Sequence, residues 1–168
     1  GSNPINIATG NKFQQETDYR GAGRMPLLFE RFYNSSTGVA STRIGAHWRH
    51  SYDRSVVGTT EPDTAYVHRA DGQVLTFRRT NNTWLTDGDV NLALVSTTST
   101  SGQISGWILK DESDAEERYS AAGRLSSIHS RSGDITALSY DASGRLATVS
   151  DPDGRTLQLQ YDANGRVS

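Results

Sequence analysis

The chain has 168 residues and a formal net charge of −2, with sixteen glycines, four prolines and no cysteine. The near-neutral charge argues against nucleic acid or an anionic membrane surface as a partner. The lack of cysteine excludes disulfides and thiolate chemistry, and no apolar run approaches the ~18 residues of a membrane-spanning helix.

The first third of the chain predicts short strands joined by loops. Gly1-Ser2 looks like a remnant of cloning, and no signal peptide is visible. Residues 3–11 read as a short strand and a turn. Apolar residues alternate with polar ones at a period of two, which indicates strands over 12–19, 27–34 and 48–57. Apolar residues on both faces of 27–34 indicate a central strand.

A hairpin is the clearest local prediction in the middle of the chain. Thr64 to Arg69 and Gln73 to Arg79 flank an Ala-Asp-Gly turn at 70–72. An Asp-Gly pair between alternating apolar residues is the strongest short-range hairpin signal. Further along, 107–110 is expected to pair with 116–119. We find no convincing helix, because even 111–118 has too few apolar residues to anchor one.

Residues 119–168 repeat with a period of 21. Tyr-Asp-Ala-Ser-Gly-Arg-Leu at 140–146 returns as Tyr-Asp-Ala-Asn-Gly-Arg-Val at 161–167. A degenerate earlier copy begins near residue 98. A fixed period of this length indicates stacked copies of one supersecondary unit. The structural repeat positions are Tyr119, Gly123, Arg124, Tyr140, Gly144, Arg145, Gly154, Tyr161, Gly165 and Arg166.

Each repeat predicts a hairpin with one apolar face. One strand covers 145–150 and the next 155–160, and Asp-Pro-Asp-Gly at 151–154 turns the chain between them. A lone hairpin is not stable, so neighbouring units must stack. We therefore expect an all-β fold, an antiparallel sheet of consecutive hairpins with little or no helix. Residues 3–97 would form an N-terminal β domain and 98–168 the repeats, the last one truncated.

Tyr-Asp-x-x-Gly-Arg-Leu followed by Asp-Pro-x-Gly-Arg resembles the YD repeat of Rhs (rearrangement hotspot) proteins, insecticidal toxin complexes and teneurins. Residues 3–13, 26–34 and 47–53 look like the domain that opens the repeat region in bacterial Rhs effectors. The resemblance implies a hollow β-shell that encloses a C-terminal toxin, which is absent from this chain. It implies secretion, by a type VI or related system, for interbacterial competition.

The resemblance also implies a structural, non-catalytic role with no cofactor and no metal. The implied partners are the rest of the shell, the enclosed toxin and a secretion spike protein. Members of the family cleave themselves at Asp-Pro-x-Gly-Leu. Residues 151–154 approach that pattern, but Arg155 stands where leucine is needed, so we interpret the segment as a turn.

A His-Trp-Arg-His run at 47–50, with Asp53, invites a metal or hydrolase interpretation. Residues three apart on a strand point to opposite faces, so we expect His47 and His50, and likewise His50 and Asp53, to diverge. The other two histidines lack metal-ligand spacing. The plain interpretation is structural, with Trp48 and Tyr52 filling a core.

The repeat residues have two interpretations. The three tyrosines could form a ladder for sugars or bases, or pack in line on one face of the sheet. The three Gly-Arg arginines could bind phosphate, or be neutralised by nearby aspartates as a solvated exterior; those aspartates are Asp141, Asp151, Asp153 and Asp162. Acidic clusters at 87–89 and 111–114 could hold calcium, but lack the spaced ligands of an EF-hand loop.

The alternative function is a carbohydrate- or protein-binding β module. It predicts that Trp48, Trp84, Trp107 or the repeat tyrosines form one exposed patch. A shell predicts that they are buried or line an enclosed face. In either case the last hairpin leaves an open sheet edge, so we expect edge-strand self-association of the chain.

Overall fold

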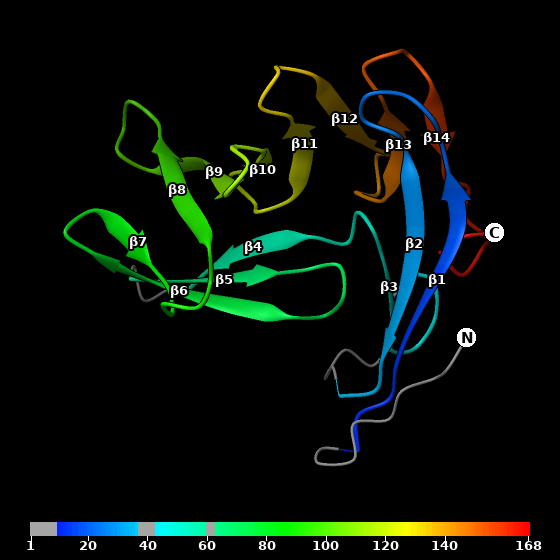
Figure 1. Ribbon diagram of the computed structural model, residues 1–168, viewed down its shortest axis with the longest axis horizontal. Coiled ribbons are helices and arrows are strands. Elements are labelled where there is room, and N and C mark those ends of the chain that lie inside the picture. Colours follow the sequence, from blue (N-terminus) through cyan, green and yellow to red (C-terminus); the bar gives the residue numbers. More distant parts are fainter. Residues whose placement is uncertain (1–9, 37–42, 60–62) are drawn as a thin grey trace.

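Strands and turns, with no helix, make up the part of the chain that the computed structural model describes, residues 10–36, 43–59 and 63–168 (Figure 1). The expected all-β fold of antiparallel hairpins is confirmed. Residues 1–2, which we expect to be a cloning remnant, and residues 3–9 of the expected strand and turn at 3–11 lie outside the described residues. In this part of the chain no helix has the length and hydropathy needed to cross a membrane.

Three antiparallel sheets follow one another along the chain. The first contains β1 (Phe13–Arg20), β2 (Leu28–Asn34) and β3 (Trp48–His50). The second contains β4 (Ser55–Gly58), β5 (Thr64–His68), β6 (Val74–Thr80) and β7 (Thr83–Leu85). The third contains β8 (Leu92–Thr98), β9 (Ile104–Asp111), β10 (Glu116–Ser120), β11 (Leu125–His129), β12 (Ile135–Tyr140), β13 (Leu146–Ser150) and β14 (Thr156–Gln158).

The third sheet holds the repeats and runs as an unbroken meander in the order β14-β13-β12-β11-β10-β9-β8. The predicted pairing of 107–110 with 116–119 is confirmed, since Trp107 lies opposite Tyr119 and Lys110 opposite Glu116. β8 spans the residue 97/98 boundary and belongs to this sheet. The division into domains at that boundary stays a prediction.

One turn geometry recurs through the repeat sheet. At 141–145 the N–H of Asp141 donates to the Arg145 carbonyl and the N–H of Gly144 donates back to the Asp141 carbonyl. The Asp141 carboxylate accepts the Arg145 N–H at 2.8 Å. The same backbone pair and the same side-chain acceptor occur in turns beginning at Asp111, Ser120, Ser130, Asp151 and Asp162. Each 21-residue period therefore contains two turns of one kind.

The fourth residue of each of these turns has a positive φ, which favours glycine. Five turns place a glycine there, and one places Asp114, with φ of 61°. The first residue is Asp or Ser because a short side-chain oxygen can reach the N–H four residues on. The regular spacing of the Gly-Arg pairs in the sequence therefore reflects this recurring turn.

The two smaller sheets pack side by side against the repeat sheet (Figure 1). The first core joins the four-stranded sheet to β8–β11, and Trp84 and Trp107 meet in it with ring centroids 5.2 Å apart. The second core sets Leu27 and Tyr52 against Leu146 and Val149 of β13. Ile128 and Leu138 contact both cores, so apolar packing is continuous along the sheet.

The predicted strand over 48–57 is wrong, because β3 ends at His50 and β4 begins at Ser55 in a different sheet. Between them the chain turns, with the Asp53 N–H donating to the His50 carbonyl at 2.8 Å. Ser and Asp favour such turns because their side chains bond to nearby backbone. This 51–54 connection carries the chain from one small sheet to the other.

Two other local predictions are confirmed. β5 and β6 form the hairpin predicted around the turn at 70–72, with Val67 opposite Leu75 and Gly72 at a φ of 91°. β2 is the central strand of its sheet, as the apolar residues on both of its faces indicate.

Candidate functional site: the joints between repeats

Each later repeat tyrosine is bonded to the preceding repeat. The Tyr140 hydroxyl donates to the Leu125 carbonyl at 2.6 Å, and the Tyr161 hydroxyl donates to the Leu146 carbonyl at 2.7 Å. In both cases the acceptor lies fifteen residues upstream, in the Gly-Arg-Leu of the previous unit. The tyrosine therefore links its own repeat to the preceding one. We call this contact a repeat joint.

The arginine of the same Gly-Arg-Leu completes each repeat joint. The Arg124 guanidinium lies 4.9 Å from the ring centroid of Tyr140, and that of Arg145 lies 4.6 Å from the ring centroid of Tyr161. Burial raises the pKa of Tyr140 to about 12 and also raises the pKa of Tyr161. Both phenols therefore keep the proton that they donate. The rings of Tyr140 and Tyr161 therefore each contact the arginine of the preceding unit.

The expected neutralisation of the repeat arginines is found at only some positions. Arg145 pairs with Asp141 at 2.6 Å. Among the described residues no carboxylate lies within 4 Å of Arg124 or Arg166, and the Tyr140 ring covers Arg124 instead. A cation over an aromatic face is attracted by the ring quadrupole, which makes this contact part of the joint.

The first repeat tyrosine uses a different acceptor. Fifteen residues before Tyr119 the chain has Gln103-Ile104 in place of Arg-Leu. Tyr119 is 3% exposed in the first core, and its hydroxyl donates to the carboxylate of Glu117. The degenerate first copy thus keeps the tyrosine and replaces the carbonyl acceptor with a carboxylate.

Glu117 is the centre of an ion cluster that joins three parts of the fold. Its carboxylate accepts from Arg54 at 2.6 Å and from Arg69 at 2.7 and 2.9 Å. Arg54 comes from the 51–54 connection, and Arg69 from the end of β5. Burial alone would raise the pKa of Glu117, but the two arginines outweigh it and hold the pKa below its usual range. The carboxylate is therefore ionised at neutral pH.

The second sheet meets the repeat sheet at Gly123. The Val56 N–H donates to the Gly123 carbonyl at 2.9 Å, and Ser55 forms an isolated antiparallel β-bridge with Arg124. A Cβ at Gly123 would lie 1.6 Å from the Val56 carbonyl oxygen. Glycine is required here for close backbone approach as well as for its φ of 73°.

His50 and Asp53 lie together, so their expected divergence is wrong. His50 Nε2 is 3.1 Å from Asp53 Oδ1, and Nδ1 accepts the Tyr52 N–H at 3.2 Å. The alternation rule fails because the strand ends at His50. Burial lowers the pKa of His50, against the opposing effect of Asp53. The imidazole stacks on Phe29 at 5.2 Å.

His47 does not join His50. Its ring lies edge-on to Tyr33, with centroids 6.0 Å apart, while His50 rests on Phe29. Trp48 is half-buried against Tyr33, and Tyr52 is buried in the second core, where its hydroxyl accepts the Leu28 N–H. Across residues 10–36, 43–59 and 63–168 no three His, Asp or Glu side chains cluster as metal ligands would.

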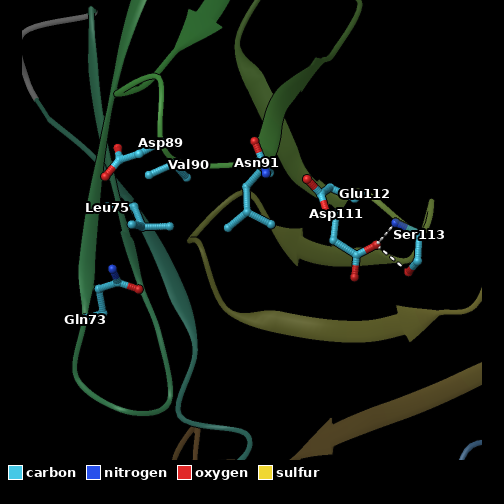
Figure 2. A pocket seen from close by; sticks show the side chains of 9 residues that line it. Gln73, Leu75, Asp89, Val90, Asn91, Asp111, Glu112 and Ser113 are labelled. Atoms are coloured by element: carbon cyan, nitrogen blue, oxygen red, sulfur yellow. Dashed lines mark hydrogen bonds between the residues drawn. The ribbon is translucent and has the colours of Figure 1, made fainter.

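Both acidic clusters line one hollow of about 440 Å³ (Figure 2). In Figure 2, Asp89 and Asp111 lie on opposite sides of it. Asp111 is occupied by its own turn, where it accepts from the N–H and hydroxyl of Ser113 at 2.8 and 2.6 Å. These carboxylates do not converge, so the hollow offers no calcium ligand set.

Comparison with known families adds two matches. Residues 2–77 match a family described as a domain of unknown function, DUF6531, which commonly precedes Rhs repeats. Residues 119–156 and 140–168 match the RHS repeat. The chain is an Rhs/YD-repeat protein. The two repeat matches begin at Tyr119 and Tyr140, which are repeat tyrosines one period apart. No curated protein matched the chain.

The RHS repeat indicates a structural role for this Rhs chain. The aromatic side chains bear on the binding-module alternative. Trp84, Trp107 and Tyr119 are each 6% exposed or less, so they cannot belong to an exposed binding patch. Trp48, Tyr140 and Tyr161 are half-buried.

Sequence reasoning missed Glu117, although one signal was present. Glu117 is two residues before Tyr119 on a strand, so both side chains point to the same, buried face. A carboxylate on that face needs a cationic partner. The sequence does not say which partner, because Arg54 and Arg69 lie 63 and 48 residues away.

Proposed function

We propose that this Rhs chain is a non-catalytic part of the β-shell of a secreted toxin, with the toxin itself lying C-terminal to the repeats. The observation that carries the proposal is the repeat joint. Tyr140 and Tyr161 each bond to the Gly-Arg-Leu of the preceding unit, so both of these units extend the same sheet by the same contact.

The proposed mechanism is confinement. A sheet that grows by identical joints can extend into a wall, and a wall that closes keeps an enclosed toxin away from the producing cell until delivery to a competitor. The partners we propose are the rest of the shell, the toxin inside it and a secretion spike. Burial of Trp84 and Trp107 supports this role over an open binding module.

Limited proteolysis of the longer gene product tests the proposal. The expected result is that the segment following the repeats resists protease when attached to them and is digested quickly when expressed alone. The segment is expressed as a catalytically inactive variant, so that its toxicity does not limit expression in the producing cell. Equal digestion rates for the attached and the isolated segment would exclude confinement.

A further inference from the structure

A second hollow, of about 200 Å³, lies where the 51–54 connection meets two repeat joints. Tyr140, Tyr161 and Gly144 contribute to it from the repeats, His50 from the end of β3 and Tyr52 from the connection. Arginine dominates its lining. The five arginines are Arg43, Arg49, Arg54, Arg124 and Arg145. Asp53 is the one carboxylate in the lining.

Two of these arginines are already neutralised. Arg54 pairs with Glu117 at 2.6 Å, and Arg145 pairs with Asp141 at 2.6 Å. Asp53 faces His50, whose pKa is lowered by burial, so the imidazole adds no charge at neutral pH. Glu117 also pairs with Arg69, so when Asp53, Asp141 and Glu117 are set against Arg69 and the five lining arginines, three positive charges remain.

The other three arginines have guanidinium groups with donors to spare. Within the described ranges no carboxylate lies within 4 Å of Arg43, Arg49 or Arg124. Arg49 donates from Nη2 to the Asp53 carbonyl at 2.8 Å, and its buried Nε has no acceptor among the residues that the structure describes. Such an unsatisfied buried donor costs folding free energy.

Two of the spare guanidinium groups are held in place by aromatic rings. Arg124 lies over Tyr140 and Arg43 lies over Tyr161, with its nitrogen 3.5 Å from the Gly165 carbonyl. A guanidinium fixed by stacking loses less freedom when it binds, and its fork matches a planar or tetrahedral oxyanion. The tyrosine hydroxyls donate elsewhere, so the arginines are the donors that face a ligand.

We propose that this hollow binds a compact oxyanion, a phosphate or carboxylate group, through Arg49 and Arg124 with support from Arg43. The anion would accept hydrogen bonds from these guanidinium groups and offset the excess positive charge. It would also clamp the 51–54 connection to two successive repeat joints. This site is independent of whether the chain encloses a toxin.

Calorimetric titration and thermal unfolding with inorganic phosphate and with succinate test the proposal. The variants are Arg49→Gln, Arg124→Gln and the double variant. Arg166→Gln is the matched control, because Arg166 holds the same repeat position as Arg124 and does not line the hollow. We expect saturable binding of phosphate, succinate or both, and a melting temperature that rises with the anion.

Each Arg→Gln change in the hollow should weaken binding roughly tenfold, the effect of one charge-assisted hydrogen bond, and the control should bind like the wild type. Tighter phosphate would identify a phosphate ligand, and tighter succinate a carboxylate. No saturable binding of either anion by the wild type would overturn the proposal, as would equal affinity in the double variant. If a variant fails to fold, the wild-type titration still decides.

Discussion

At the scale of single residues, tyrosine and glutamate side chains connect the repeats and the sheets. The tyrosine of each later repeat reaches back to a backbone carbonyl, and an arginine covers its ring. Glu117 instead forms ion pairs with Arg54 and Arg69, which lie in two other parts of the chain. The first contact extends the repeat sheet, and the second fastens the smaller sheets to it.

Replacing Glu117 by Gln should destabilise the fold by about 3–5 kcal/mol, because two partly buried arginines would lose their carboxylate. Urea unfolding of the purified chain measures the change. Glu112→Gln is the matched control, since Glu112 is exposed, and it should change the free energy of unfolding by less than about 0.5 kcal/mol. Equal effects of the two changes would contradict the role of the cluster.

The same carboxylate should make stability depend on pH. The folded-state pKa of Glu117 is held below its ordinary value of 4.5. Its stabilising contribution is therefore complete above pH 4.5 and is lost as the pH falls through the lower, folded-state value. Unfolding followed from pH 7 to pH 3 should show a shallower loss in Glu117→Gln than in the wild type. Parallel curves would show that Glu117 does not titrate differently on folding.

Tyr140→Phe should cost about 1 kcal/mol, the typical net value of one hydrogen bond, because the Leu125 carbonyl loses its side-chain donor while the ring stays. Tyr66→Phe removes a hydroxyl from an exposed ring and serves as the control. Chemical denaturation of both variants gives the difference. A Tyr140→Phe variant as stable as Tyr66→Phe would mean that the joint rests on the ring and its arginine alone.

At the scale of elements, glycines in equivalent turns have unequal surroundings. Gly123 and Gly154 both have positive φ, of 73° and 83°. A Cβ at Gly123 would collide with the Val56 carbonyl, whereas a Cβ at Gly154 would meet nothing within 4 Å. The shared turn explains why both are glycine, and the contact with β4 makes one of them indispensable.

Gly154→Ala should therefore cost about 1–2 kcal/mol, the strain of a left-handed backbone alone. Gly123→Ala should cost more than about 4 kcal/mol or prevent folding, because the backbone of β4 must move away. Circular dichroism during urea titration measures both changes. Similar losses of stability in the two variants would show that β4 does not pack closely against the first Gly-Arg turn.

The elements that the sequence predicted best are those fixed by neighbouring residues. The Asp-Gly hairpin and the recurring Gly-Arg turns depend on φ preferences and short side-chain bonds, which a local pattern records. The strand over 48–57 was predicted wrongly because alternation continues across the turn at 51–54. His50 and Asp53 were misplaced for the same reason. The Glu117 cluster and the arginine hollow depend on residues far apart in the chain, which no local pattern brings together.

At the scale of the whole molecule, two short sheets pack against one long sheet, and β14, at one end of the long sheet, has no second partner strand in the described part of the chain. β14 pairs with β13 on one side, and it exposes Thr156 and Gln158. An unpaired edge is a template for pairing with another chain. We therefore still expect self-association through β14.

Light scattering across a concentration series should show a mass that rises with concentration. Thr156→Lys places a charge on the edge and should shift the chain toward monomer. Ala137→Lys, an exposed change in the interior strand β12, should leave the association as it was. A wild-type chain that stays monomeric at millimolar concentration would contradict edge pairing.

Electron cryomicroscopy of the longer gene product is the most direct measurement of the shell. The seven-stranded sheet should continue through further hairpins, each with a tyrosine bonded to the preceding Gly-Arg-Leu, and close around a cavity that holds additional density. Repeats that continue as an open ribbon, or a sheet that encloses only its own side chains, would contradict the proposal that this chain forms part of a container.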